Sequence, residues 1–232
     1  MNHIRTVYKR LLAFHGSQGW WPIVNESTLR SEYHLGAPRN GDDFFEISIG
    51  AILTQNIAWK NVDTALAALK IRGVLDPLSM RRLNPRTLGK IIRPTGYYNQ
   101  KAKKIRNFLD FYKRYDYDHR ALGRCDNQDL RKELLSVNGI GPETADSILL
   151  YALNIKTFVV DAYTRRIFTR LGILTGKEAY HEIQDLFHKR FKGSVPEYNE
   201  YHALIVAHGK DYCKKKPLCD TCCIASLCEK KY

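Results

Sequence analysis

The sequence predicts an all-α fold, and three observations support this class. Apolar residues recur at helical spacing from the start of the chain, beginning with Ile4, Val7, Tyr8, Leu11 and Leu12. There is no tandem repeat or low-complexity tract, and no two segments alternate convincingly as paired strands would. A glycine-marked hairpin also separates two helical segments. A chain of 232 residues built this way can bury a substantial core, as one domain or two lobes.

The composition favours an anionic partner. Lys and Arg together number 37 against 24 Asp and Glu, which gives a formal net charge of +13. Nucleic acid is the commonest partner of such a chain, although ribosomal contacts or an acidic membrane surface would fit the charge alone. No stretch reaches the ~18 apolar residues of a membrane span, and the first residues lack a signal peptide's apolar region. We therefore expect a soluble, cytoplasmic monomer.

The second helix is expected to begin at Asp42 or Asp43, either of which can cap it. Its buried surface is supplied by four apolar residues, Ile47, Ile49, Ile52 and Leu53. The helix should break near Gln55 and Asn56, before another helix over residues 58–69. A polar pair at such a break is most often an ordinary helix end.

A turn at Gly96–Gln100 leads into a further helix, after a stretch of short turns and helices that is less informative. The apolar stripe of this helix comprises Ala102, Ile105, Phe108, Leu109 and Tyr112. Its other face is basic and carries Lys101, Lys103, Lys104 and Arg106. A run of charges is usually a solvated face, but it is also a candidate for contacts with a phosphate backbone. Residues 115–126 are predicted to form a linker.

The hairpin Asn138-Gly139-Ile140-Gly141-Pro142 is the most distinctive stretch of the chain. Its two glycines allow positive φ and leave no side chain between the backbone and an approaching ligand. Pro142 suits the first position of a helix, where its missing N–H costs nothing. The N–H groups of the turn and of the helix start then predict a site for one phosphate.

Asp161 comes eighteen positions after Glu143, at the start of a predicted helix over residues 162–170. An Asp in this place is a good N-cap, and that alone would explain it. The helix N-terminus also favours an ionised carboxylate, so a capping role and a chemical role are compatible. Two more amphipathic helices are predicted after residue 176.

Four cysteines, Cys213, Cys219, Cys222 and Cys228, lie within sixteen residues near the end of the chain. In a reducing compartment such crowding indicates a metal rather than disulfides. A compact loop of four thiolates suits a [4Fe–4S] cluster. Zinc is the less favoured alternative, because only one pair has the CxxC spacing of a zinc knuckle. Cys223 is an additional thiol and is not predicted to be a ligand.

Four motifs in this order resemble the helix-hairpin-helix Gly/Pro/Asp superfamily of DNA glycosylases, and within it the endonuclease III branch. They are Ile52–Asn56, Gly96–Ala102, the hairpin with Asp161, and the cysteine loop. The resemblance covers nearly the whole chain. One departure is the first gap of the cysteine loop, which is typically six residues in that family and five here.

The resemblance implies two helical lobes with a DNA cleft between them. The central lobe, a helical barrel with the helix-hairpin-helix, would span residues 35–154. Residues 1–34 and 155–232 would form the other lobe, which carries the cluster loop. The partner implied is double-stranded DNA with a damaged base, and in a prokaryote the protein would be associated with the nucleoid.

Several residues acquire DNA-binding roles from this resemblance. In the family a glutamine at the position of Gln55 fills the gap that a flipped nucleotide leaves in the duplex. The predicted DNA contacts are Gln55, Asn56, Lys101, Gly139, Ile140 and Gly141, with Lys214 and Lys215 at the basic tip of the cysteine loop. The metal would then serve to order that tip.

The resemblance also assigns chemistry to Asp161 and Glu143. An ionised Asp161 near C1′ of a flipped nucleotide would stabilise developing oxocarbenium charge and help to position water. Bifunctional members carry a lysine at the position of Glu143, and that lysine attacks C1′ and leads to strand cleavage. Glu143 cannot do this, so a monofunctional glycosylase is predicted. The role of Glu143 itself is open, and Lys210 is the alternative source of an attacking amine.

The predicted base pocket contains Trp20, Trp21, Pro22, Phe45 and Lys210. Trp-Trp-Pro followed by an aromatic residue in the next helix resembles endonuclease III-like enzymes specialised for 3-methyladenine. A plainer explanation is that the tryptophans are core or lid residues. An alkylated, cationic purine held against aromatic faces gives 3-methyladenine as first choice, with 7-methylguanine second. The alternatives are a thymine/uracil mismatch glycosylase, an oxidised-base glycosylase, and a non-catalytic DNA-binding or redox module.

Overall fold

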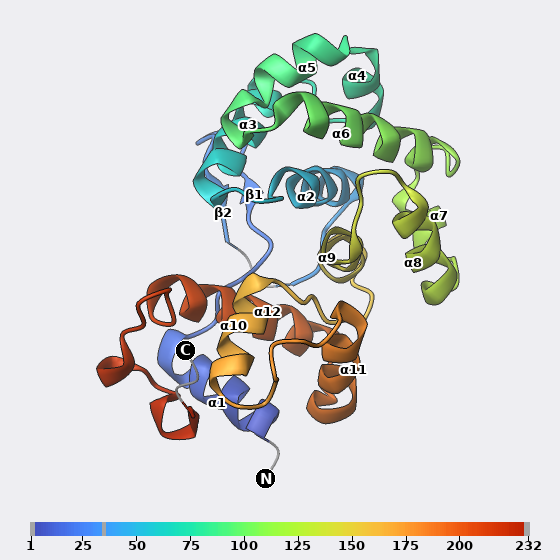
Figure 1. The fold of residues 1–232 in the computed structure, drawn as a ribbon. Coiled ribbons are helices and arrows are strands. Elements are labelled where there is room, and N and C mark those ends of the chain that lie inside the picture. Colours follow the sequence, from blue (N-terminus) through green and yellow to red (C-terminus); the bar gives the residue numbers. More distant parts are fainter. Residues whose placement is uncertain (1–2, 34–35, 230–232) are drawn as a thin grey trace. The chain divides into compact units, whose positions relative to one another are not determined.

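The computed structural model describes residues 3–33 and 36–229, and confirms that the fold is all-α (Figure 1). Its α-helices are α1 (His3–His15), α2 (Gly41–Leu53), α3 (Trp59–Ile71), α4 (Pro77–Arg82), α5 (Pro85–Ile91), α6 (Tyr98–Lys113), α7 (His119–Gly123), α8 (Asn127–Ser136), α9 (Pro142–Ser147), α10 (Ala162–Arg170), α11 (Tyr180–Phe191) and α12 (Val195–Asp211). Short 3₁₀ segments are η1 (Arg93–Thr95), η3 (Cys219–Thr221) and η4 (Ala225–Leu227), and η2 (Ile148–Ala152) is a π-helical turn. No helix in the described ranges is long and apolar enough to cross a membrane.

The chain divides into two compact units. One consists of residues 21–155, and the other combines residues 1–20 with 156–232. The expected lobe boundary at Leu35 lies outside the described residues, but the first unit already begins at Trp21. The reason is that β1 (Ile23–Val24) is buried against α2 and α3, and the Val24 N–H donates to Glu46 at 2.6 Å.

β1 pairs in antiparallel fashion with β2 (Ser31–Glu32), a feature that the sequence did not predict. Each strand has only two residues, which is too short for an alternating pattern to be visible.

Unit 21–155 is built around α2, which contacts α3, α6, α9, η2 and β1 (Figure 1). Every residue of α2 from Asp43 to Leu53 is buried, as expected of a helix that is covered on all sides. Its buried Glu46 lies 3.0 Å from Lys70 of α3, so the charge is paired inside the core. The N-cap is Asn40, whose side chain accepts from the Asp43 N–H at 2.9 Å. Neither Asp42 nor Asp43 caps the helix.

The segment between α6 and α8 differs from the predicted linker. Residues His119–Gly123 form α7, because Asp118 caps it by accepting from the Arg120 N–H at 2.9 Å. The helix of residues 98–113 and its apolar stripe are as expected.

The other unit packs α1 and α10 against α12, with α11 alongside α1. Its core is strongly aromatic. The rings of Phe158 and Phe187 stack with their centroids 3.7 Å apart, and the buried Tyr201 donates its hydroxyl to the Ile4 carbonyl at 2.6 Å. This contact joins the first helix of the chain to its last long helix, so residues nearly 200 positions apart share one core.

Candidate functional site

The hairpin between α8 and α9 depends on glycine at one position. Gly139 has φ +97, and a Cβ there would lie 2.3 Å from Cγ of Lys104 on α6. Gly141 instead adopts φ −91 and ψ 177, an extended conformation that any residue can take, and serves as the N-cap of α9. Positive φ is therefore required only at Gly139. Pro142 opens α9 as predicted, and Ile140 is buried beneath the turn.

Gln55, just beyond the end of α2, is bonded to this hairpin. Its side-chain Nε2 donates to the Gly139 carbonyl at 3.1 Å and to the Thr144 hydroxyl at 2.9 Å. Its Oε1 accepts a hydrogen bond from Nζ of Lys104. The neighbouring Asn56 is exposed and has φ +57, so it forms the tip of the turn. Two motifs some 84 residues apart are thus joined within one unit.

The structure corrects the prediction for Lys101. Its side chain is 2% exposed, and Nζ donates to the carbonyls of Leu53 at 2.8 Å and Thr95 at 2.7 Å. Burial, assisted by the nearby Lys104, lowers the pKa of Lys101 to about 8. Lys101 therefore joins the ends of α2, η1 and α6 and cannot reach a DNA phosphate. Of this basic face, Lys103 is exposed and Lys104 half-buried.

Trp21 lies in the core of unit 21–155. It is 5% exposed, and its ring meets those of Trp59 and Tyr151 edge-on, each with centroids 5.3 Å apart. Gly50 of α2 makes room for the indole, because a Cβ there would come within 3.1 Å of its nitrogen. Pro22 is also buried, and Trp20, which belongs to the other unit, is half-buried.

Phe45 is buried as well. Its side chain is 1% exposed and faces Tyr112 of α6 in a stacked contact with centroids 6.5 Å apart. Phe45 is thus buried in unit 21–155 as Trp21 is, and its place in the predicted base pocket stays a prediction. Trp59, at the start of α3, was not predicted to have a role. It is half-buried and is the more accessible neighbour of Trp21.

Asp161 caps α10 as predicted. Its Oδ1 accepts from the Thr164 N–H at 2.7 Å, and its backbone is extended, with φ −105. Its Oδ2 lies 3.8 Å from Nε2 of His202 on α12. Burial lowers the pKa of His202, while the Asp161 carboxylate acts in the opposite direction. A neutral imidazole therefore flanks the carboxylate. The sequence indicated His202 only as a histidine on the buried face of a predicted helix.

Glu143 and Lys210 are both exposed. Glu143 lies in the first turn of α9, two residues after Gly141, and Lys210 lies in the last turn of α12.

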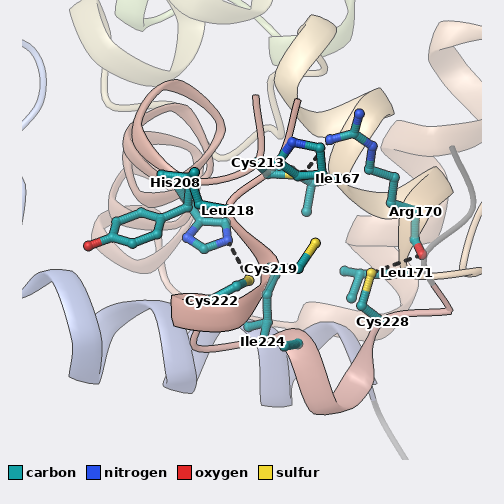
Figure 2. A pocket seen from close by; sticks show the side chains of 13 residues that line it. Ile167, Arg170, Leu171, His208, Cys213, Leu218, Cys219, Cys222, Ile224 and Cys228 are labelled. Atoms are coloured by element: carbon teal, nitrogen blue, oxygen red, sulfur yellow. Dashed lines mark hydrogen bonds between the residues drawn. The ribbon is translucent and has the colours of Figure 1, made fainter. Parts of the chain in front are cut away.

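Four cysteines surround one cavity, as Figure 2 shows. The thiols of Cys213, Cys219, Cys222 and Cys228 line it, whereas Cys223 is not among the lining residues. Its walls are largely apolar and include Ile167, Leu171 and Ile224. Four thiols around a small, largely apolar cavity are a donor set that fits an iron–sulfur cluster.

Two arginines of α10 fasten the cysteine loop. Arg170 donates to Sγ of Cys213 at 3.2 Å and to the Lys214 carbonyl at 2.6 Å. Arg166 donates to the Cys213 carbonyl at 2.7 Å. Lys214 and its neighbour Lys215 remain exposed at the tip of the loop, in agreement with a surface role.

On the opposite side of the cavity, Nε2 of His208 lies 3.3 Å from Sγ of Cys222 (Figure 2). Burial, with a smaller contribution from His15, lowers the pKa of His208 to about 4, while Asp211 acts in the opposite direction. The imidazole is therefore neutral, and one of its nitrogens can donate to a thiolate.

A family profile described as HhH-GPD superfamily base excision DNA repair protein matches residues 49–192. This range includes the segment after α2, the hairpin and Asp161. The chain belongs to the HhH-GPD superfamily.

Curated members of the superfamily align over most of the chain. The protein MJ1434 of Methanocaldococcus jannaschii, named provisionally as a DNA repair glycosylase, is 42% identical over 98% of this chain and 96% of its own. An endonuclease III of Sulfolobus acidocaldarius is 32% identical over 89% of each chain. The chain is accordingly an endonuclease III-like DNA glycosylase of the HhH-GPD superfamily.

Solved structures agree with this assignment. The Helicobacter pylori 3-methyladenine DNA glycosylase MagIII, bound to 1,N6-ethenoadenine, superposes with a TM-score of 0.73 at 26% identity, covering 90% of this chain and 96% of its own. A trapped endonuclease III–DNA covalent intermediate gives a TM-score of 0.75 at 21% identity, covering 98% and 95%, which shows the same fold.

Within this HhH-GPD glycosylase, the structure brings together some of the predicted site residues. Gln55 contacts the hairpin, and the four cysteines share a cavity. Lys101 is instead buried, with Nζ bonded to the carbonyls of Leu53 and Thr95. Trp59, which meets Trp21, and His202, which lies beside Asp161, were missed because each contact joins segments that are distant in sequence.

Proposed function

We propose that this glycosylase is monofunctional and hydrolyses the N-glycosidic bond of a flipped, alkylated purine, 3-methyladenine above all. The observation that carries this proposal is that the two candidate catalytic positions both hold carboxylic acids and neither holds a lysine. A carboxylate is present at Asp161, while Glu143 occupies the position where bifunctional relatives carry the attacking lysine. Without that amine, a Schiff base with C1′ cannot form, and water becomes the nucleophile.

Asp161 would act through its ionised carboxylate. One oxygen is held by the Thr164 N–H, which fixes the orientation of the group, while Oδ2 does not take part in that cap. A carboxylate fixed in this way stabilises positive charge that develops on the sugar as the base departs, at little cost in reorganisation. Its other function is to orient the water that completes hydrolysis. His202, neutral and 3.8 Å away, does not neutralise the carboxylate.

The hairpin would bind a backbone phosphate, since Gly141 is exposed and a Cβ there would meet nothing within 4 Å. Gln55 would fill the gap left by the flipped nucleotide, with Asn56 beside it. The exposed Lys214 and Lys215 would contact further phosphates. The net charge of +13 supports binding to double-stranded DNA.

The substrate follows from the charge of the base. Alkylation at N3 or N7 makes a purine cationic and weakens its glycosidic bond. The enzyme therefore needs to recognise the damaged base more than it needs to protonate the departing one. A cation against an indole face gains roughly 1–2 kcal/mol when it is desolvated. The candidates for this contact are Trp20, the ring pair Trp21 and Trp59, and Phe45. The similarity to MagIII supports this class of substrate, with 7-methylguanine second.

We also propose a resident [4Fe–4S] cluster, held by Cys213, Cys219, Cys222 and Cys228, in preference to zinc. When bound, the cluster would supply a rigid anchor for the loop that carries Lys214 and Lys215. The loop is also held by the chain itself, because Arg166 and Arg170 donate hydrogen bonds to its backbone carbonyls.

The decisive experiment is excision from a panel of duplexes that carry 3-methyladenine, 7-methylguanine, thymine or uracil mismatches, and oxidised pyrimidines. Release of 3-methyladenine is expected. Asp161→Asn should abolish release and retain DNA binding, whereas Asp185→Asn, at an exposed carboxylate of α11, should change neither. Release of thymine or uracil alone would overturn the assignment of substrate.

Lyase activity is tested separately by borohydride trapping. A monofunctional enzyme gives no covalent adduct with DNA and leaves the abasic strand intact. A trapped adduct that disappears in Lys210→Gln would instead show that Lys210 supplies a displaced amine, and would contradict the proposal.

A further inference from the structure

Three potential metal ligands gather beside the four-cysteine cavity and are not used by it. They are His15, the last residue of α1, His208 of α12, and Cys223, the additional cysteine between η3 and η4. One ligand atom from each lies within 4.8 Å of the other two. Three segments from opposite ends of the chain thus converge on one point, and all three belong to the same compact unit.

The two imidazoles present their nitrogens directly to one another. Nε2 of His15 lies 3.1 Å from Nδ1 of His208, close to the separation of two ligand atoms on a single tetrahedral metal ion. His208 is buried, while His15 and Cys223 are half-buried, so the point can be reached from solvent. Two imidazoles and one thiolate are a borderline-soft donor set that suits Zn²⁺.

His208 has a second contact that agrees with this arrangement. Its Nδ1 faces His15, while its Nε2 lies 3.3 Å from Sγ of Cys222. A metal on Nδ1 fixes the proton on Nε2, which can then donate to the Cys222 sulfur. One imidazole ring would therefore serve both as a ligand of one metal and as a hydrogen-bond donor to a thiolate of the neighbouring cavity.

The surroundings hold the ligands in place. Tyr212 stacks on His208, with ring centroids 5.5 Å apart and planes 10° apart, and meets His15 edge-on at 5.7 Å. Phe14 packs edge-on against His15 at 4.9 Å. These contacts restrict both imidazoles, so binding a metal orders few additional side chains. With three ligands from the protein, the fourth position is left to water.

We propose that His15, His208 and Cys223 bind one Zn²⁺ ion at a site separate from the four-cysteine cavity. Binding forms a Zn–S bond and two Zn–N bonds and releases the thiol proton of Cys223 to solvent. The ion would join the end of α1 to α12 and to the cysteine loop. This inference does not depend on which damaged base is excised.

The test measures iron and zinc in the full-length protein, purified without oxygen and freed of loosely held metal by brief treatment with a mild chelator. One zinc per chain should remain in addition to the iron of the cluster. Cys223→Ser and His15→Asn should each lose the zinc while retaining iron and the visible absorption of the cluster. Cys125→Ser and His181→Asn, at a cysteine and a histidine outside the site, should retain both metals.

Cobalt provides a second readout that does not depend on metal content alone. Co²⁺ bound at the site in place of Zn²⁺ should show a sulfur-to-cobalt charge-transfer band that Cys223→Ser eliminates. The proposal is overturned if zinc is absent from the wild-type protein with its cluster intact. It is also overturned if zinc content is the same in Cys223→Ser as in Cys125→Ser, or if zinc is lost only together with iron.

Discussion

Replacing Lys101 with methionine should change how the stability of the protein depends on pH. Lys101 is buried, with a pKa lowered from 10.5 to about 8 in the folded state. A lysine whose folded pKa is depressed binds fewer protons when folded than when unfolded between these values. The free energy of unfolding of the wild type therefore rises with pH between about 8 and 10.5 and carries the full penalty below about 8.

The magnitude follows from the shift. A difference of 2.5 between the two pKa values corresponds to a penalty of roughly 3 kcal/mol at pH 7, of which roughly 2 kcal/mol is relieved by pH 9.5. Lys101→Met removes the titration but leaves the buried carbonyls of Leu53 and Thr95 without their donor, at a cost of ~1–3 kcal/mol each. The two effects oppose each other at neutral pH, so the pH dependence is the sharper observable.

The assay is urea unfolding of the wild type and of Lys101→Met at pH 7 and pH 9.5. The wild type should gain roughly 2 kcal/mol relative to the variant between these two values. Lys103→Met is the matched control, because Lys103 lies on the same helix and is exposed. A difference between wild type and Lys101→Met that stays constant with pH would refute the argument, and so would an equal effect in the control.

Two further predictions concern the hairpin. Gly139→Ala should lose ~1–3 kcal/mol of stability and weaken DNA binding, because residue 139 has φ +97 and its new Cβ would overlap Lys104 of α6. Gly141→Ala should change stability little, because no described atom lies within 4 Å of the added Cβ. Urea unfolding and DNA titration of the two variants measure the difference. Asp146→Asn should cost ~3–5 kcal/mol, because the buried carboxylate forms paired bonds of 2.7 and 2.9 Å to Arg131 across α8 and α9. The exposed Asp129→Asn should cost less than ~1 kcal/mol, and similar melting temperatures for these two variants would contradict this prediction.

The features that the sequence predicted correctly depend on local signals. Helical periodicity identified α1 and α6, and the position of Asp161 before a helical segment identified the cap of α10. The start of α9 at Pro142 was predictable for the same reason, since the conformational restriction of proline is intrinsic. The family resemblance rested on such local motifs, and the comparisons confirm it.

The errors have a different origin. Lys101 looked like part of a basic surface, but its environment depends on Leu53, which is 48 residues away. For α7 a local signal did exist, since Asp118 caps it, but the helix is only five residues long. The proximity of His15 and Cys223 could be recognised only in the folded structure, because these residues lie near opposite ends of the chain.

The bonds that hold Gln55 affect how an enzyme of this kind would search DNA. If Gln55 enters the duplex as proposed, it must first give up its hydrogen bonds to the hairpin and to Lys104. Insertion then exchanges these hydrogen bonds for new ones to DNA, with little net gain in free energy. Intact base pairs resist the insertion. A lesion that has already weakened its own pairing shifts this balance, so the protein would begin to discriminate while it moves along the helix, before any base is extruded.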